Sequence, residues 1–252
     1  MKNILITNDD GIQAKGIRTL VDALSEIADI YVVAPDAQRS ACGHGITMHI
    51  PMVVKEVEFP NAKKAWTASG TPADCVKLGV RELVEKVDLV VSGTNMGANL
   101  GNDCFYSGTV SGAAEGIFCD YPSVAVSICS HTPENYEPSQ KIARTVVEMV
   151  LEKGLAPGTM LNVNVPDIPG SEIKGVRITS LGRVKYEENF SYGISNLGSK
   201  FYWYTGKPLR IAQTGDSDIQ AIRDKYISIS PLKFDITDRE RMEEFRNWNI
   251  EF

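Results

Sequence analysis

The sequence lacks the signals of a membrane protein and of a secreted, disulfide-bonded one. No run of apolar residues approaches the roughly 18 that a membrane span needs, and the amino terminus shows no signal-peptide pattern. The five cysteines form no Cys-x-x-Cys pair and are odd in number, which argues against a disulfide framework. We therefore expect a cytoplasmic protein with reduced thiols and no membrane partner.

Positive charge is also scarce. The 252 residues contain 26 Lys and Arg against 32 Asp and Glu, for a formal net charge of -6. Because non-specific binding to nucleic acid depends on clustered Lys and Arg, a nucleic-acid polymer is not an expected partner. Small anions are compatible with this charge where a metal ion or backbone amides supply local positive potential.

Several motifs of nucleotide and hydrolase chemistry are missing as well. The sequence has no GxxxxGK[ST] loop and no GxGxxG fingerprint, which disfavours a Walker-type triphosphate site and a dinucleotide site. The GxSxG turn of one class of Ser/His/Asp hydrolase is absent, and the three histidines show no zinc-ligand spacing.

The first part of the chain alternates continuous apolar runs with apolar residues at helical spacing, the pattern of repeated βα units. It predicts an α/β fold with a Rossmann-like, mostly parallel sheet flanked by helices over residues 1–155. The expected strands are 2–7, 30–34, 52–59, 65–68, 87–92 and 122–128, with 52–59 and 65–68 paired as a hairpin. The expected helices are 15–27, one that begins near 72 after the N-cap Thr71, 111–118 and 139–153.

Residues 156–252 predict a smaller, strand-rich and more antiparallel region. The expected elements here are strands at 160–165, 176–180, 183–187 and 201–204 and a charged terminal helix at 238–248. The aromatic residues Phe201, Tyr202, Trp203 and Tyr204 fall on an expected projecting hairpin. Successive strand side chains point to opposite faces, so at least two of these rings must face away from their own domain. Burial of those rings against a second subunit predicts a homodimer or homotetramer formed through this region.

Two adjacent carboxylates, Asp9 and Asp10, follow the first expected strand directly. In an open α/β sheet, ligands bind outside the carboxyl ends of the strands, and paired Asp oxygens there suit a hard cation such as Mg²⁺ or Mn²⁺. The alternative interpretation is a plain turn, because Asn-Asp-Asp-Gly is rich in turn-forming residues.

The loop at residues 35–44 is longer than the usual βα connection of about two to six residues. It offers a hydroxyl ligand in Ser40, an anion contact in Arg39 and a histidine, His44. Taken alone, it equally fits an ordinary solvated loop.

A Gly- and Asn-rich loop, residues 92–103, follows the strand expected at 87–92. Its Asn95 and Asn99 offer neutral oxygen ligands for a hard cation or for a phosphate-bound water. Each of them also fits a simple Gly/Asn turn.

The segment at residues 106–116 places hydroxyls and free amides at a helix start. Ser107, Gly108 and Thr109 would form an anion site there, because helix N-termini bind anions through unpaired N–H groups. The small residues are equally suited to tight packing of the helix on the sheet.

Together these motifs resemble the SurE family of survival-protein nucleotidases. The sequence carries, in the family's order, TNDDG at 7–11, VAPDAQRSACGHGIT at 33–47, GTPADCV at 70–76, DLVVSGTNMGANLG at 88–101 and SGTVSGAAEG at 107–116. The C-terminal part adds TGD at 214–216 and YISISPL at 226–232. Five ordered motifs are highly specific, and the resemblance covers nearly the whole chain.

The resemblance implies a divalent-metal-dependent phosphomonoesterase that acts on nucleoside 5′- and 3′-monophosphates, with short polyphosphate as a further substrate. It implies one metal ion per subunit, Mg²⁺ or Mn²⁺, and the roles of its residues by motif position. The implied metal ligands are Asp9, Asp10, Ser40 and Asn95, and the implied phosphate contacts are Asn99, Ser107, Gly108 and Thr109. We expect catalytic roles for Asp9, Asp10 and Asn95 and substrate contacts from Arg39 and His44. Family members exchange C-terminal elements between subunits, which agrees with the expected oligomer.

Tyr106 departs from the expected pattern, because we expect a His before SGTVSG in many relatives. If that His protonates the leaving group in relatives, the role is either missing here or taken by His44. Asp9 is the expected base for an attacking water, with direct attack by Asp9 on phosphorus left open.

A non-catalytic nucleotide-sensing module on the same fold is the rival interpretation, because fold alone does not fix function. The paired carboxylates favour the enzyme, since an anion receptor gains little from two negative charges beside a phosphate.

Overall fold

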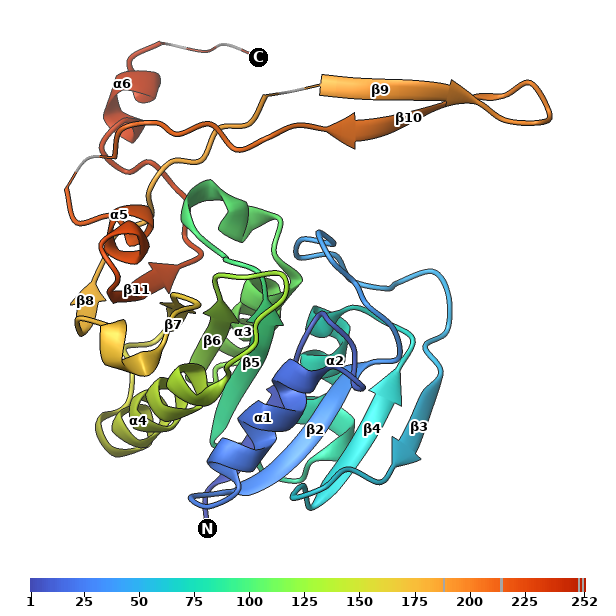
Figure 1. Cartoon of the computed structure of the whole chain (residues 1–252), viewed down its shortest axis with the longest axis vertical. Helices are drawn as coiled ribbons and strands as arrows, with labels where there is room; N and C mark the ends of the chain where they lie inside the picture. Colours follow the sequence, from blue (N-terminus) through green and yellow to red (C-terminus); the bar gives the residue numbers. More distant parts are fainter. Residues whose placement is uncertain (188, 214, 249, 251) are drawn as a thin grey trace.

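The computed structural model describes residues 1–187, 189–213, 215–248, 250 and 252 (Figure 1). Within these residues, nine strands form one sheet in the order β3-β4-β2-β1-β5-β6-β7-β11-β8, and β9 and β10 form a separate two-stranded sheet. The strands of the large sheet are β1 (Asn3–Thr7), β2 (Asp29–Pro35), β3 (Val54–Val57), β4 (Lys64–Ala68), β5 (Leu89–Met96), β6 (Ser123–Ile128), β7 (Thr159–Val165), β8 (Val176–Ile178) and β11 (Ile227–Lys233).

Neighbouring strands from β4 through β2, β1, β5 and β6 to β7 are parallel. The antiparallel pairs in this sheet are β3 with β4 and β11 with β7, and β8 is parallel to β11. The predicted α/β class, the mostly parallel sheet and the hairpin of β3 and β4 are therefore confirmed.

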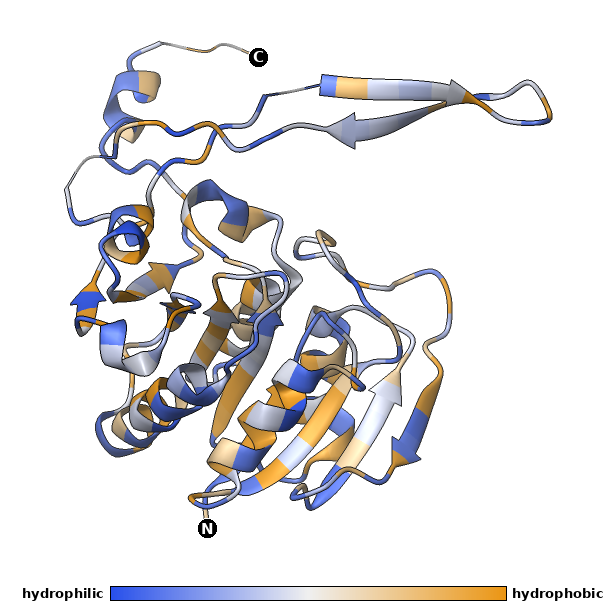
Figure 2. Ribbon diagram, viewed as in Figure 1, coloured by the Kyte–Doolittle hydropathy of each residue, from blue (hydrophilic) through white to orange (hydrophobic). Residues whose placement is uncertain are grey.

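Helices cover both faces of the sheet (Figure 1). The main ones are α1 (Lys15–Leu24), α2 (Pro72–Leu78), α3 (Gly108–Phe118) and α4 (Glu137–Lys153). Side chains of β1 alternate between the faces: Ile4 and Ile6 belong to the apolar core under α1 and α4, whereas Leu5 packs with residues of α2. Figure 2 shows the resulting apolar strands between more polar outer helix faces.

Two helix starts follow from capping residues. Thr71 accepts a hydrogen bond from the Asp74 amide, and the Asp74 side chain accepts one from the Thr71 amide, so α2 opens with a capping box as predicted. Ser107 Oγ accepts a hydrogen bond from the Val110 amide, so α3 begins at Gly108 and not at residue 111.

Three other predictions are corrected. Strand β5 continues through Met96 instead of ending at residue 92, so Asn95 lies on the strand and not in a loop. Residues 183–187 form no strand. Within this segment, Tyr186 forms an isolated β-bridge with Pro208. The terminal helix is only α6 (Met242–Arg246), shorter than the expected 238–248. Thr214 of the TGD motif lies outside the described residues.

The C-terminal half adds further elements to the main sheet. Strands β7, β11 and β8 extend the sheet, and α5 (Asp218–Arg223) packs against β11. A domain boundary near residue 155 stays a prediction. Strand β10 (Lys200–Thr205) carries the aromatic residues and forms the predicted projecting hairpin (Figure 1). Its partner, β9 (Asn189–Ile194), was not among the expected strands. Within the described segments, no helix is both long and apolar enough to cross a membrane.

Candidate active site

The candidate site lies where the order of the parallel strands reverses. From β1 the chain adds β2 and β4 on one side, and it then returns to place β5 on the other side of β1. The crevice outside such a switch point is where ligands bind in open α/β sheets. Asp9 and Asp10 follow β1, and Asn95 lies at the end of β5, so the topology brings the predicted ligands together.

Asp9 is the most enclosed of these groups, with 4% of its surface exposed. Its Oδ1 accepts a hydrogen bond from Thr109 Oγ1 at 2.5 Å. Burial raises the pKa of Asp9 to about 6, although the Thr109 hydrogen bond acts in the opposite direction. A Cβ added to Gly108 would lie 2.7 Å from Asp9 Cβ and 3.0 Å from Cys42 Sγ, so the helix start approaches Asp9 as closely as glycine permits.

Asp10 and Ser40 are linked by a residue that the sequence did not single out. Gln38 Nε2 donates to Ser40 Oγ at 2.9 Å and to Asp10 Oδ1 at 3.4 Å. Asp10 Oδ2 accepts a hydrogen bond from the Met96 amide at 3.0 Å, which joins the ends of β1 and β5. Burial raises the pKa of Asp10 above its ordinary value.

Asn95 reaches the site because β5 is irregular near its end. The β5–β6 register shifts between Ser92 and Asn95. Gly93 lies in this stretch at φ 138°, where an added Cβ would come 2.3 Å from the Val126 carbonyl oxygen. Asn95 Nδ2 donates to the Gly97 carbonyl at 2.9 Å, which leaves the side-chain oxygen available as a ligand.

The donor chemistry of the site fits a hard divalent cation. Two carboxylates, a hydroxyl and an amide oxygen are the ligand types of Mg²⁺ and Mn²⁺. Among the residues that the structure describes, no group of three or more His, Cys, Asp or Glu side chains is placed to hold a metal. Asn8 precedes Asp9 in the sequence, and its buried Oδ1 has no hydrogen-bond partner in the described part of the chain.

The side chains of three predicted contact residues make hydrogen bonds within the protein. The Arg39 guanidinium donates to Asp36 and to the Ser69 carbonyl, each at 3.0 Å. The backbone amide of Arg39 donates to the backbone carbonyl of Asp9. The Ser107 hydroxyl caps α3. Asn99 is buried, and its Nδ2 donates to Ser127 Oγ at 2.7 Å.

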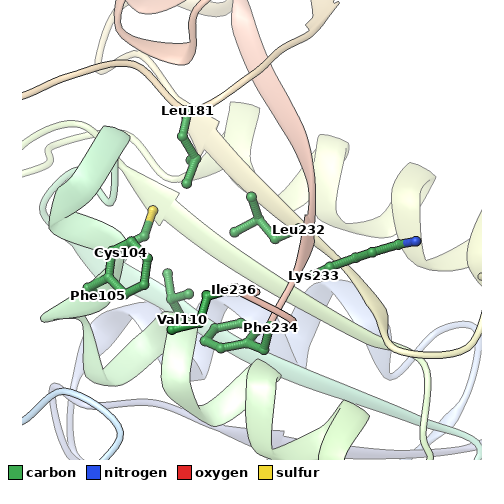
Figure 3. A pocket seen from close by; sticks show the side chains of 8 residues that line it. All are labelled: Cys104, Phe105, Val110, Leu181, Leu232, Lys233, Phe234 and Ile236. Carbon is green, nitrogen blue, oxygen red and sulfur yellow. The ribbon is translucent and has the colours of Figure 1, made fainter. Parts of the chain in front are cut away.

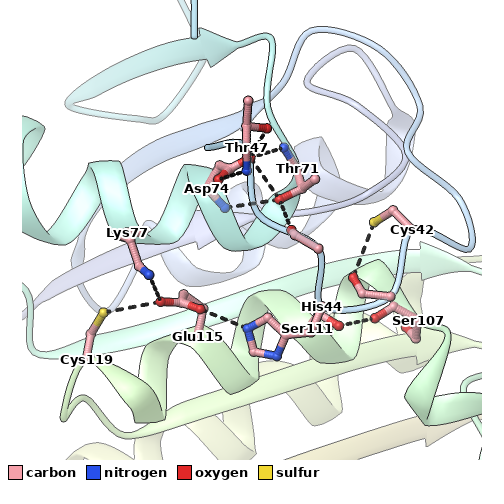
Figure 4. A network of polar contacts seen from close by, with 12 residues as sticks. Cys42, His44, Thr47, Thr71, Asp74, Lys77, Ser107, Ser111, Glu115 and Cys119 are labelled. Atoms are coloured by element: carbon pink, nitrogen blue, oxygen red, sulfur yellow. Dashed lines mark hydrogen bonds and ion pairs between the residues drawn. The ribbon is translucent and has the colours of Figure 1, made fainter. Parts of the chain in front are cut away.

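His44 is also directed away from the carboxylate pair. Its Nε2 lies 2.8 Å from Glu115 Oε2, and its ring stacks on Phe118 with centroids 5.1 Å apart (Figure 4). Tyr106, in the position where a His was expected, is 65% exposed.

Strand β7 contributes polar residues that the sequence analysis missed. Asn162 and Asn164 each donate through Nδ2 to the Asn99 carbonyl at 2.9 Å, and Asn164 Oδ1 accepts from the Asn99 amide. The signal was the alternation of Asn with apolar residues in the buried sequence LNVNV, which places two amides on one face of a central strand. For Gln38 the sequence signal was weaker: it lies in the same loop as the predicted ligand Ser40, two residues before it.

A small apolar cavity of about 40 Å³ lies on the α3 side of the sheet (Figure 3). It is lined by Cys104, Phe105, Val110, Leu181, Leu232, Lys233, Phe234 and Ile236. These side chains include no carboxylate, hydroxyl or imidazole, so we assign the cavity to packing and not to the site.

A family model described as "Survival protein SurE" matches residues 4–188. The chain belongs to the SurE family. It is 43% identical over 251 residues to the 5′-nucleotidase SurE of Alkaliphilus metalliredigens, a match that covers 98% of this chain and 99% of that protein. It is 45% identical over 246 residues to the 5′-nucleotidase SurE of Pelotomaculum thermopropionicum, covering 96% and 93%. The crystal structure of SurE from Aquifex aeolicus superposes with a TM-score of 0.85 at 36% identity and covers 98% of this chain and all of that one. The resemblance of the sequence motifs to the SurE family is confirmed.

Proposed function

We propose that this protein is a metal-dependent 5′-nucleotidase. It would hydrolyse nucleoside 5′- and 3′-monophosphates to nucleoside and phosphate, with short polyphosphate as a further substrate. The SurE relatives compared above carry the first of these activities in their names. The observation that carries the proposal is the contact of Asp9 with Thr109, because it joins a carboxylate pair to the start of a helix at the sheet's switch point.

One divalent ion, Mg²⁺ or Mn²⁺, would be held by Asp9, Asp10, Ser40 and Asn95. When bound, such an ion polarises a phosphoryl oxygen and lowers the pKa of a bound water. The linking contact of Gln38 with Asp10 and Ser40 supports this ligand set, since it brings oxygens from two loops to one place.

The chain's own groups then have separate tasks. The amides of Gly108 and Thr109 lie in the first turn of α3, where N–H groups have no intrahelical partner, and they would bind the phosphate. The Thr109 hydroxyl holds the Asp9 carboxylate in place. Asp9 would accept the proton of the attacking water. We favour attack by water over a phosphorylated Asp9, because the enclosed carboxylate is already oriented by Thr109.

The nucleoside would lie in a groove beside the helix start. The groove has a volume of about 1200 Å³, ample for a nucleoside because small-ligand pockets are typically about 300–1,000 Å³. Ala41, next to Ser40, and Tyr106, next to Ser107, both line it, as do Arg183 and Lys185. We therefore assign contact with the leaving group to this groove and Tyr106.

Phosphate release from a panel of nucleotides and polyphosphates, with Mn²⁺, Mg²⁺ or EDTA, tests the proposal. We expect activity on nucleoside monophosphates that EDTA abolishes. Asp9→Asn should lower kcat by about 100-fold or more, the scale of a lost acid-base group. Asp22→Asn, which changes a surface carboxylate that accepts from Asn61, is the matched control. Turnover in EDTA, or a normal Asp9→Asn enzyme, would refute the proposal and favour a nucleotide-sensing module.

We also propose a homodimer or homotetramer in the cytoplasm, assembled through the C-terminal region, with residues 1–155 as catalytic core and 156–252 as the region of assembly. The support is the exposed β9–β10 hairpin, since large exposed apolar patches mark interaction surfaces.

A further inference from the structure

The segment that carries Ser40, residues 36–50, has no helix or strand of its own. We call it the Ser40 loop. A ligand on such a loop is held precisely only if other contacts fix the loop, because metal sites depend on the groups that orient their ligands. Two buried carboxylates make those contacts, one from α2 and one from α3 (Figure 4).

The first contact is with Asp74 of α2. Its Oδ1 accepts from the Thr47 amide at 2.9 Å, and its Oδ2 accepts from the Thr47 hydroxyl at 2.6 Å. The Thr71 hydroxyl donates to the Gly45 carbonyl at 2.7 Å. The far end of the Ser40 loop is therefore tied to the capping box of α2.

The second contact is with Glu115 of α3, a residue with only 3% of its surface exposed. Its Oε2 lies 2.8 Å from His44 Nε2, and its Oε1 lies 3.0 Å from Lys77 Nζ of α2. The flat side of the His44 ring is stacked on Phe118. A buried carboxylate needs charged or hydrogen-bonding partners. Removal of His44 would therefore leave the Glu115 carboxylate without one of its two partners named here.

The position of Glu115 separates His44 from the phosphate end of the helix. Glu115 comes six residues after Thr109, which places it roughly 9 Å further along the α3 axis at about 1.5 Å per residue. An imidazole bonded to Glu115 is thus not held beside a phosphate at the first turn.

We propose that His44 and Glu115 are positioning residues that hold the Ser40 loop over the active site. Three residues separate His44 from Ser40, and one of them, Gly43, donates from its amide to the Tyr106 carbonyl at 3.0 Å. The contact with Glu115 therefore fixes the loop on α3 close to Ser40. The inference deepens the proposed function, on which it rests, because it takes Ser40 as a metal ligand.

Two variants of the whole protein separate the contacts of His44. His44→Phe keeps a ring for stacking on Phe118 but loses the bond to Glu115, whereas His44→Gln keeps a side-chain donor. His49→Phe, an exposed histidine on the same loop, is the matched control. Equilibrium dialysis with Mn²⁺ gives the Kd, and amide hydrogen exchange of the metal-free protein gives the mobility of residues 36–50.

We expect His44→Phe to weaken Mn²⁺ binding by about 10-fold or more, the range seen when a group that orients a ligand is removed. Exchange in residues 36–50 should speed up while the strands of the sheet stay protected. His44→Gln should recover most of the affinity, and His49→Phe should match the wild type. Glu115→Leu removes both carboxylate oxygens and should reproduce the His44→Phe result, with Glu148→Leu, at a surface partner of Arg144, as its control.

Unchanged Mn²⁺ affinity and unchanged loop exchange in His44→Phe would overturn the proposal. So would an equal loss of kcat in His44→Phe and His44→Gln with normal Mn²⁺ binding, because that result assigns His44 to proton transfer. If the wild type binds no Mn²⁺, the proposed metal site fails, while loop exchange still decides whether His44 fixes the loop.

Discussion

A single hydroxyl sets the geometry of the carboxylate at the centre of the site. Thr109 Oγ1 and Asp9 Oδ1 are 2.5 Å apart, both side chains are buried, and they come from segments 100 residues apart. Burial alone would favour protonation of Asp9, and the hydrogen bond from Thr109 limits that effect. The contact therefore affects both the direction and the ionisation of the proposed base.

Thr109→Val removes this hydroxyl and keeps the shape of the side chain. A hydrogen bond to a charged group contributes about 1.5–3 kcal/mol, so kcat/KM for a nucleoside monophosphate should fall by about 10-fold or more while the fold is kept. Steady-state kinetics and circular dichroism provide the measurement. Thr145→Val, which removes an exposed hydroxyl on α4, should have no effect. An unchanged kcat/KM in Thr109→Val would place the catalytic carboxylate elsewhere.

Sequence patterns predicted the strand-end residues better than the loop side chains. The positions of Asp9 and Asp10 were predictable, because residues that directly follow a buried parallel strand lie at the carboxyl edge of the sheet. The directions of Arg39 and His44 were not predictable, since each is set by a distant partner. Arg39 turns to Asp36 and the Ser69 carbonyl, and His44 turns to Glu115, 71 residues away.

At the scale of the elements, the site depends on how closely α3 approaches β1. Gly108→Ala would place a Cβ 2.7 Å from Asp9 Cβ, so the helix start must move. We expect kcat/KM to fall by about 10-fold or more, because small displacements at a reacting centre have large effects on rate. Gly170→Ala is the control, since its nearest contact, Glu137 Oε2 at 3.5 Å, is an ordinary one. Full activity in Gly108→Ala would show that this close approach is not required.

Helix α2 should make stability depend on pH through Asp74. Burial acts to raise the pKa of Asp74, but hydrogen bonds from Thr47 and Thr71 outweigh it and leave the pKa below the ordinary value of 3.8. A carboxyl with a lowered pKa in the folded state stabilises the protein above pH 3.8, and this contribution is lost as the pH falls through the folded-state pKa.

We therefore expect Asp74→Asn to be less stable than the wild type at pH 7, by about 1–3 kcal/mol for a disrupted buried hydrogen-bond set. The difference should narrow below pH 3.8. Urea unfolding between pH 3 and 7 measures it, with Asp22→Asn as the control. A difference that stays constant over this range would contradict the assignment to the ionised carboxyl.

The start of α2 was predicted well, whereas the start of α3 was placed three residues too late despite its local cap, Ser107. Thr71 was recognised as a cap because its capping box is local. The extension of β5 to Met96 was missed, because a strand that passes through Gly93 with a shift of register depends on its neighbour β6. The isolated bridge of Tyr186 to Pro208 likewise depends on a contact that no local pattern specifies.

For the whole molecule, the parallel core could be predicted from the alternation of strands and helices, but the extent of the sheet could not. Strand β11 pairs antiparallel with β7 and parallel with β8, so residues late in the chain complete a sheet that begins at its start. Long-range pairings of this kind leave little trace in the periodicity of a single strand. The projecting hairpin was predicted because its four consecutive aromatic residues are themselves the signal.

That hairpin leads to the last prediction, which concerns assembly. Phe201, Tyr202, Trp203 and Tyr204 are 43–66% exposed, so both faces of β10 present aromatic rings to solvent. A two-stranded hairpin is marginally stable by itself, and burial of its rings against a second subunit would stabilise it.

We expect light scattering to give at least twice the 27.6 kDa of one chain. Trp203→Ser combined with Tyr204→Ser should shift the protein towards the monomer at micromolar concentration, since assembly depends on protomer concentration. The matched control, Met149→Ser, removes an exposed apolar side chain on α4 and should leave the mass unchanged. A monomeric wild type, or a double variant of unchanged mass, would rule out the hairpin as the interface.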